Sequence, residues 1–493
     1  MTEDQVRAER MTFTLMRCAL ACVMITIIGG ASSILFYIEQ IAKFLNGYGI
    51  QFQNLRPLHT TFASAWIFLG GVACVHRYLF SAIASPTPGD RKRFRFQMVC
   101  WGLAGAGICL TLPFGLSSGR EYLGFHPIFS LLILAGWLAF AVTFFKKVSK
   151  GFFERPVYVY MWGTGVLFFV FTFIEGHAYL IPQVRNYPIA DLQIQWKHCG
   201  TLVASFNMLV YGALLYLGEL VTGDKSYARS TKAFVFLGIG MLNSFTNYAH
   251  HTYHIPQDHL IKWVAFVVSM IEIIILVSIF NDLRRAIAKT TPTDRFTQTT
   301  RYLAIGRAWS FGLLALALLI SVPPLNAVIH GTRVVMAHAM GSEIGIDTLV
   351  LFAFFSFVIE DAFSRCWRTQ AWLRHIDARR LINRLNGSLI ALFLWLMLDG
   401  LVTGITRAQS MPLPEWLAKI SPMATVVLGT IHAYYLLRVV HDLGMMLKRP
   451  VDRRRLECDV FPDYPVPPRS LLPPPSTKNI SSGIGDDVGA DHV

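Results

Sequence analysis

The chain has 493 residues, of which 54% are hydrophobic and only 15% charged, and its formal net charge is +14. Soluble domains carry about 25% charged residues. This composition therefore excludes an ordinary soluble domain and indicates a protein of the lipid bilayer.

Twelve apolar runs are long enough to cross a membrane, since about 20 such residues span the hydrocarbon core. In chain order they cover residues 13–38, 58–84, 96–117, 125–147, 157–182, 194–221, 232–254, 259–281, 303–325, 329–358, 385–408 and 419–447. The first run has no small-residue cleavage site and is followed by further spans, so we expect a retained helix rather than a signal peptide. The sequence thus predicts an all-α polytopic membrane domain with twelve transmembrane helices over residues 1–448. Residues 449–493 are polar and Pro-rich and are expected to form a disordered cytoplasmic tail.

The positive charge alternates between the two sides of the predicted membrane. Alternate loops hold groups of Lys and Arg, as in residues 91–95, 146–155 and 284–301, whereas the loops between them hold one or two each. Because cytoplasmic loops carry the excess of Lys and Arg, both termini are predicted to be cytoplasmic. The basic charge then reflects membrane topology and does not indicate nucleic acid binding.

Several histidines are predicted to lie at one depth, near the outer ends of four spans. They are His59 in the second span, His198 in the sixth, His250 and His251 in the seventh, and His330 and His338 in the tenth. Ionisable residues within a membrane are usually functional, and imidazole is a common ligand for haem iron, copper and non-haem iron. We therefore expect His198, His250 and His251 to bind one metal, and His59 and His338 to be axial haem ligands.

A buried acid accompanies these histidines. Glu272 stands in the apolar sequence of the eighth span, 21 residues after His251. An acid in such a position is costly and functional by default, so we expect it to deliver protons or to tune the metal. The eight cysteines form no CxxC or CxxCH pair, which excludes covalent c-type haem attachment.

Four local patterns resemble the catalytic subunit of the haem–copper oxidase superfamily and, within it, the nitric oxide reductases. They are RPLHT at residues 56–60, SGREY at 118–122, HGT at 330–332 followed by Ala337-His338, and SMIE at 269–272. The resemblance covers all twelve spans and leaves out the tail. It implies the twelve-helix fold of that subunit in the inner membrane of a bacterium.

The resemblance also implies roles for individual residues. His338 would be the proximal ligand of the high-spin haem, and Arg56 and Arg120 would neutralise haem propionates. Glu121 would help to bind a calcium ion that bridges propionates, and Glu272 would lie near the non-haem metal. The implied reaction converts two NO, two electrons and two protons to N₂O and water, as in denitrification. Two b-type haems, a non-haem iron or copper, and an electron-donor subunit with a cytochrome c or dinuclear copper centre are implied with it.

Two positions depart from the family pattern. Members carry His-x-His on the tenth span, but this chain has His338-Ala339-Met340. A thioether can ligate haem iron, so we propose that His59 and Met340 ligate the low-spin haem; the alternative is that Met340 only packs. No acid lies one turn after His198, which leaves the non-haem metal open between iron and copper, with Glu272 as a candidate oxygen ligand.

Two other functions stay open. An oxygen reductase of the cytochrome c oxidase type, cbb3-like, would need a tyrosine at the binuclear centre. Tyr248 and Tyr253 flank the histidine pair, although neither has the expected spacing. More remotely, twelve spans suit a proton-coupled secondary transporter, but the inverted repeats typical of transporters are not evident.

Overall fold

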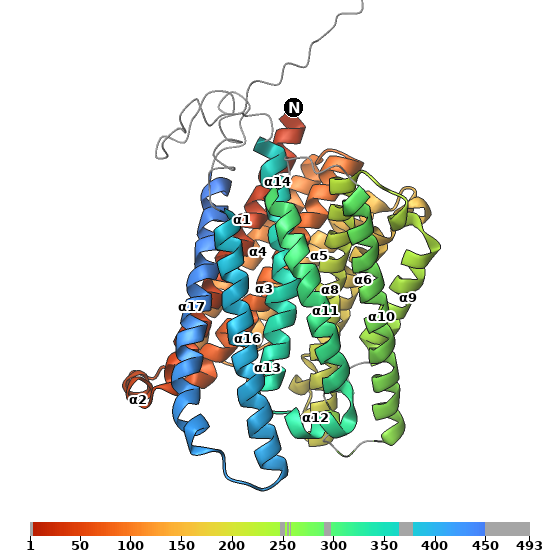
Figure 1. Ribbon diagram of the computed structural model, residues 1–493. Helices are drawn as coiled ribbons and strands as arrows, with labels where there is room; N and C mark the ends of the chain where they lie inside the picture. Colours follow the sequence, from red (N-terminus) through yellow and green to blue (C-terminus); the bar gives the residue numbers. More distant parts are fainter. Residues whose placement is uncertain are drawn as a thin grey trace, which may run out of the picture.

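The computed structural model describes residues 3–246, 252–253, 256, 258–289, 297–363 and 378–448. Within these ranges the regular structure is helical, apart from one isolated β-bridge between Ser117 and Phe125. The long helices stand side by side in one bundle (Figure 1). The predicted all-α membrane class is confirmed, while the predicted tail, residues 449–493, lies outside the described residues.

The helices are, in chain order, α1 (Glu3–Ile34), α2 (Glu39–Gly47), α3 (Phe52–Tyr78), α4 (Pro88–Thr111), α5 (Pro127–Val148), α6 (Val157–Glu175), α7 (Pro182–Arg185), α8 (Pro188–Thr222), α9 (Thr231–Thr246), α10 (His259–Lys289), α11 (Thr297–Ser321), α12 (Pro323–Ile329), α13 (Arg333–Met340), α14 (Leu349–Phe363), α16 (Ala378–Ala408) and α17 (Glu415–Leu447). A π-helical segment, η9 (Gly341–Thr348), joins α13 to α14.

Within the described residues, ten helices are long and apolar enough to cross a membrane. They match ten of the twelve predicted spans. The other two predictions are 232–254, whose last third lies largely outside the described residues after α9, and 259–281, which falls on α10, where several side chains are outside the described part. The number twelve is therefore not confirmed.

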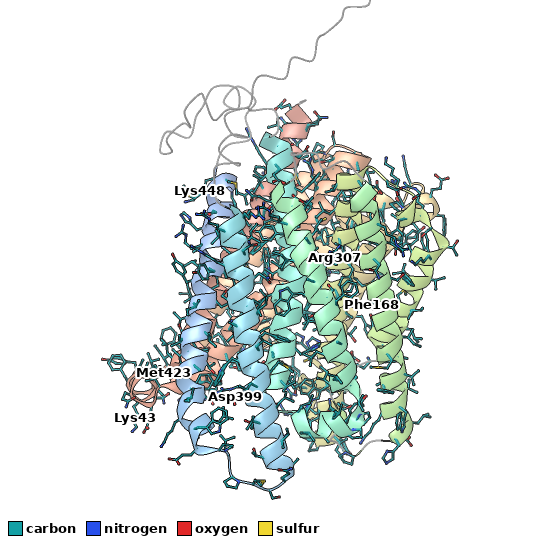
Figure 2. All side chains as sticks on the ribbon, in the orientation of Figure 1. Lys43, Phe168, Arg307, Asp399, Met423 and Lys448 are labelled. Atoms are coloured by element: carbon teal, nitrogen blue, oxygen red, sulfur yellow. The ribbon has the colours of Figure 1, made fainter. Side chains whose placement is uncertain are left out.

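The two ends of the bundle differ in the segments that they hold. The start of α1 and the end of α17 lie together at one end, and α2 and α12 lie at the other (Figure 1). The Arg17 side chain of α1 links α1 to the end of α17, because its Nε donates a hydrogen bond of 2.8 Å to the Leu447 carbonyl. Figure 2 shows Lys448 at this N-terminal end and Lys43 at the opposite α2 end.

Burial separates central helices from peripheral ones. Most residues of the apolar stretches of α3, α8 and the α13–α14 span are buried, whereas only a third or less of the stretches of α1, α4, α16 and α17 is buried. The exposed side chains are themselves apolar, as at Met423, Val427 and Ile431 of α17, and Figure 2 shows Met423 on the outside of the bundle. An apolar exterior of this extent fits contact with lipid.

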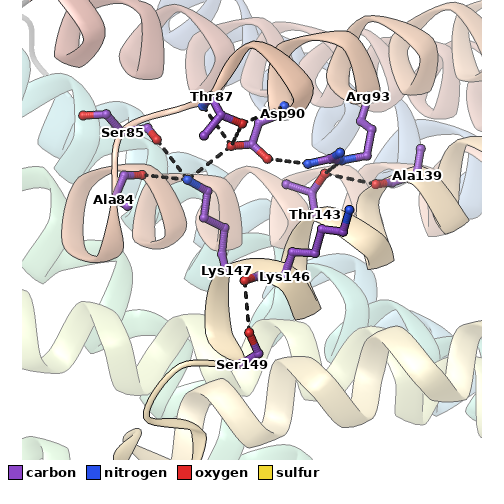
Figure 3. A network of polar contacts seen from close by, with 10 residues as sticks. All are labelled: Ala84, Ser85, Thr87, Asp90, Arg93, Ala139, Thr143, Lys146, Lys147 and Ser149. Carbon is purple, nitrogen blue, oxygen red and sulfur yellow. Dashed lines mark hydrogen bonds and ion pairs between the residues drawn. The ribbon is translucent and has the colours of Figure 1, made fainter.

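Basic residues at the N-terminal end connect α5 to the start of α4 (Figure 3). Thr87 and Asp90 form a capping box at the first turn of α4, which satisfies backbone N–H groups that the helix leaves free. Lys147 Nζ of α5 donates a hydrogen bond of 2.9 Å to the Ser85 carbonyl and lies 3.2 Å from Asp90 Oδ2. Arg93 Nε of α4 donates a hydrogen bond of 2.9 Å to Thr143 Oγ1 of α5. Two of the predicted inner-loop cations therefore stabilise the packing at this end.

The predicted tenth span, 329–358, begins differently from the expectation. α12 ends at Ile329 and α13 begins at Arg333, because Gly331 adopts a φ of +73° that favours glycine. His330 thus lies in a turn before the span and not in its first half. Its carbonyl accepts a hydrogen bond of 2.8 Å from Arg407 Nη2.

Candidate functional site

His59 lies near the start of α3, where α3 packs closely against α1. Its Nδ1 is 2.8 Å from the Thr26 carbonyl, and since a carbonyl can only accept, Nδ1 carries the hydrogen. The contact depends on small residues of α1: a Cβ on Gly30 would lie 2.7 Å from His59 Nδ1. With Nδ1 engaged, Nε2 keeps its lone pair, as metal-bound histidines usually do. The geometry of His59 fits a haem ligand.

His198 lies in α8 and faces α6. Its Nδ1 is 2.7 Å from the Thr172 carbonyl, while its buried Nε2 has no hydrogen-bond partner. Gly176 lies against the ring, since a Cβ there would be 2.5 Å from His198 Nδ1. The residue is 2% exposed, and a buried acceptor without a partner costs about 1–3 kcal/mol. An oriented imidazole with a free Nε2 fits a metal ligand.

α8 packs on α9, the helix that precedes the predicted histidine pair in the sequence. Thr201, three residues after His198, donates a hydrogen bond of 3.3 Å from its hydroxyl to the Ser244 carbonyl of α9. α9 runs toward the α2 end of the bundle (Figure 1), and His198 lies in the first half of α8. His250 and His251 themselves lie outside the described residues, so the predicted three-histidine site stays a prediction. Among the described residues, no group of three or more His, Cys, Asp and Glu side chains could hold a metal ion.

His338 and Met340 lie on α13 and point in different directions. The buried His338 Nδ1 has no hydrogen-bond partner. Met340 packs on a small apolar cluster that consists of Ala337 of α13 and of Leu392 and Leu396 of α16. Residues two apart in a helix are about 200° apart around its axis, so the two side chains lie on nearly opposite sides of α13. Their roles as haem ligands stay predictions.

The loop between α4 and α5 packs onto the start of α3. Glu121 forms a bidentate ion pair with Arg56, with Nη1–Oε2 at 2.9 Å and Nη2–Oε1 at 3.2 Å. The loop approaches closely, because a Cβ on Gly124 would lie 2.6 Å from Pro57 Cβ. The RPLHT and SGREY patterns, about 60 residues apart in the sequence, thus form one surface next to His59.

Arg120 points from the same loop toward α8. Its Nη1 lies 2.8 Å from Asp191 Oδ2 and 3.1 Å from Gln195 Oε1, and its guanidinium stacks 4.5 Å above the Tyr179 ring. Both predicted propionate-binding arginines therefore lie at the α2 end. Arg56 lies on the His59 side, and Arg120 lies on the His198 side.

The remaining predicted residues are less informative. Glu272 lies within α10, but its side chain is outside the described part of the structure. Tyr248 lies outside the described residues. Tyr253 is buried, and its hydroxyl donates 3.2 Å to the Ser321 carbonyl at the end of α11. This hydroxyl therefore anchors a loop to α11.

Two acids near this site were missed by the sequence analysis. Glu343 and Asp347 lie in η9, directly after the predicted haem ligands of α13. They are acids within an apolar span, so the argument applied to Glu272 would have found them. Tyr122 of the SGREY pattern was also missed, and its hydroxyl lies 3.5 Å from Glu343 Oε1.

Comparison with known proteins matches the chain to a protein family. A family model described as "Cytochrome C and Quinol oxidase polypeptide I" matches residues 14–382. The chain is similar to the cbb3-type cytochrome c oxidase subunit CcoN1 of Stutzerimonas stutzeri, with 24% identity over 177 residues, or 34% of this chain. That match spans about a third (36%) of the relative's length.

A solved structure has the same fold. A chain of a heme-copper terminal oxidase dimer, determined by cryo-EM, superimposes with a TM-score of 0.70. The alignment covers 94% of this chain and 88% of the other at 16% sequence identity, so the likeness concerns the fold alone. The family match, in contrast, covers most of the chain. The chain belongs to the cytochrome c and quinol oxidase polypeptide I family, the subunit I family of the haem–copper oxidases.

Proposed function

We propose that this chain is the catalytic subunit of a nitric oxide reductase in a bacterial inner membrane. The observation that carries the proposal is the bidentate pair of Arg56 and Glu121. It joins the two patterns that resemble the reductases, RPLHT and SGREY, at the α2 end and next to His59. The family membership already makes the chain a haem- and metal-binding oxidoreductase of the membrane, and leaves no basis for the transporter alternative.

The residues present fit the expected groups. His59 and His198 each hold Nδ1 against a backbone carbonyl and leave Nε2 for a metal. In the proposal, His59 and Met340 hold a low-spin haem, His338 holds a high-spin haem, and His198 with His250 and His251 holds iron or copper. These groups, when bound, supply the electrons and the binding sites for two NO molecules.

The protein supplies orientation, charge balance and protons. In the proposal, Arg56 and Arg120 at the α2 end would compensate the charge of anionic propionates, since charge-assisted hydrogen bonds are the stronger ones. Thr172 and Gly176 set the direction of the His198 ring. Glu272 provides protons, and Glu121 with Arg56 holds the outer loop closed and can bind calcium. The balanced reaction is 2 NO + 2 e⁻ + 2 H⁺ → N₂O + H₂O.

An oxygen reductase is the second candidate. It is favoured by the similarity to CcoN1, which is named as a subunit of a cytochrome c oxidase. The balanced reaction would be O₂ + 4 e⁻ + 4 H⁺ → 2 H₂O. In both cases electrons would come from a partner subunit with a cytochrome c or dinuclear copper centre.

Gas turnover by the purified complex distinguishes the two. NO loss with N₂O formation, and separately O₂ loss, are measured with the same artificial electron donor. Fast NO loss with one N₂O per two NO, together with slow O₂ use, supports the reductase. Fast O₂ use with little N₂O overturns it in favour of the second candidate.

A pair of variants tests the observation that carries the proposal. Glu121→Gln removes one charge of the Arg56 pair, and Glu415→Gln removes one charge of an exposed outer pair with Lys419. We expect Glu121→Gln to lower NO turnover and alter the haem spectrum, with no change in Glu415→Gln. Equal behaviour of the two variants would contradict a role of Glu121 in the site.

A further inference from the structure

Tyr122 is held in an unusual backbone conformation that directs it into the bundle. It is one of two non-glycine residues with positive φ in the described chain, at +59°. Such a conformation costs about 1–3 kcal/mol and persists where surrounding structure enforces it. The loop supplies that structure: Ser118 N donates 2.9 Å to the Gly124 carbonyl across the turn. The phenol thereby reaches Glu343, with its hydroxyl 3.5 Å from Oε1.

The phenol is neutral in this setting. The ordinary pKa of a tyrosine hydroxyl is about 10, so the phenol carries its proton near neutral pH. A neutral phenol can both donate and accept a hydrogen bond. It can therefore connect the outer loop to Glu343 without carrying charge into the bundle.

Asp347 is a buried acid with no partner. It is 1% exposed, and neither carboxyl oxygen has a hydrogen bond. An ionised carboxylate without partners is very costly in a low dielectric, so such a group neutralises by taking up a proton. Asp347 lies four residues after Glu343 in η9, and i→i+5 bonding places residues four to five apart on the same side of a π-helix.

The π-helical segment packs closely on α11. A Cβ on Gly341 would lie 2.5 Å from Leu313 Cδ2, and one on Gly345 would lie 2.7 Å from the Trp309 ring. Thr348 bonds the Glu343 carbonyl at 2.7 Å and accepts from Trp66 Nε1 at 2.9 Å. Short π segments in helices are frequent at functional sites. Here the segment presents two acids in a row along one span.

The groups that act on Glu343 and Asp347 are carboxyl groups and one phenol. Glu343 acts on Asp347, and Tyr122 and Glu121 act on Glu343. On the neighbouring helices, Arg333 of α13 pairs with Asp399 of α16. At the far end of α14, Glu360 is bonded to Gln298 N at 3.1 Å and Thr299 Oγ1 at 2.7 Å. No described ion pair neutralises Glu343 or Asp347.

We propose that Glu343 and Asp347 form a proton-binding pair that takes up protons from the outer face through the Tyr122 hydroxyl. A proton from water at the α2 end passes along the Tyr122–Glu343 contact and converts the Asp347 carboxylate to the acid. The phenol gives its own proton to Glu343 and receives one from the outer side, and Glu343 in turn gives a proton to Asp347, so the phenol and Glu343 both end unchanged. The inference rests on the proposed function only in that a gas reductase consumes protons.

Infrared spectroscopy of the purified holoenzyme tests the pair directly. The C=O stretch of a protonated carboxylic acid, followed during H₂O/D₂O exchange, is compared in the parent, Asp347→Asn, Glu343→Gln and Tyr122→Phe. We expect Asp347→Asn to lose one exchanging acid band, and Tyr122→Phe to keep that band but exchange it more slowly. Electrode-driven reduction with a pH dye should also show fewer protons taken up by Asp347→Asn.

Two matched controls are available. Glu360→Gln removes a buried acid of the same span that has hydrogen-bond partners, and Tyr158→Phe removes a phenol that lies 3.2 Å from Glu219 Oε2 at the opposite end. Both should keep the Asp347 band, its exchange rate and the proton uptake.

The outcome is independent of which gas is reduced. Loss of the band in Asp347→Asn with faster O₂ than NO turnover would support the pair and contradict the proposed reductase. An unchanged band and unchanged proton uptake in both acid variants would overturn the pair. Stoichiometric binding of Na⁺ or Ca²⁺ that is lost in Asp347→Asn would overturn it as well, in favour of a cation site.

Discussion

The Nδ1 atom of His198 lies 2.7 Å from the backbone carbonyl of Thr172, across the α6–α8 interface. The same interface places Gly176 against the imidazole, so the ring has one orientation and its Nε2 is left without a partner. His59 shows the same relationship with Thr26 of α1. In both cases a neighbouring helix, and not the histidine's own helix, sets the direction of the free nitrogen.

Gly176→Ala should disturb the second metal selectively. The added Cβ would lie 2.5 Å from His198 Nδ1, so the ring must turn away from the Thr172 carbonyl. Loss of such an orienting contact typically lowers metal affinity about 10- to 100-fold. We expect the ratio of non-haem metal to haem to fall, measured by elemental analysis, with the haem spectrum retained. Gly238→Ala, at a helical glycine with open space around it, is the control and should keep its metal.

Gly30→Ala should affect the low-spin haem. The new Cβ would lie 2.7 Å from His59 Nδ1, and overpacking of this kind costs about 1–3 kcal/mol. We expect weaker low-spin haem bands in the optical spectrum, while the high-spin bands persist. Gly102→Ala, where a Cβ meets nothing within 4 Å, should leave the spectrum unchanged. A full low-spin signal in Gly30→Ala would speak against His59 as its ligand.

Met340→Leu distinguishes ligation from packing. The two side chains have similar volume, so the apolar contact with Ala337, Leu392 and Leu396 should survive with a cost below about 1.5 kcal/mol. If the thioether ligates iron, the low-spin haem becomes five-coordinate, and its magnetic circular dichroism signature of methionine ligation disappears. Met340→His should restore six-coordination and lower the reduction potential, because His/Met ligation raises it. The half-exposed Met336 offers the control, Met336→Leu.

Asp399→Ala should destabilise the α2 end of the bundle. Asp399 is buried and pairs with Arg333, which also donates 3.0 Å to Thr425 Oγ1. Leaving a buried charge without its partner costs about 3–5 kcal/mol. We expect a clear decrease in the thermal unfolding midpoint in detergent. Glu415→Ala breaks the exposed pair with Lys419 and should change stability by no more than about 1 kcal/mol.

Much of the architecture was predictable because it is a local property of the chain. A span must satisfy its own backbone hydrogen bonds in lipid, so long apolar runs predict helices such as α3 and α8. The start of α13 was not predictable in this way, since Gly331 and the turn at His330 depend on how α12 packs and on the Arg407 contact.

The site residues divide in the same manner. His59 and His198 could be identified because imidazoles are rare and costly in a membrane. Glu343 and Asp347 carried the same signal in the run GSEIGID and were overlooked. Thr172 carried no signal, because a threonine in a helix is common, and Tyr122 stood out only as part of the SGREY pattern. The importance of both residues comes from what they contact.

The sequence by itself determined the membrane class, the helical spans, the alternating loop charge and the positions of the candidate ligands along them. All of these follow from local hydropathy, charge and side-chain chemistry. The tertiary structure decided which residues meet: Arg56 with Glu121, Tyr122 with Glu343, and the imidazoles of His59 and His198 with carbonyls of neighbouring helices. These contacts join segments far apart in the chain, so they depend on close packing at small residues such as Gly30, Gly124 and Gly176 rather than on any local pattern.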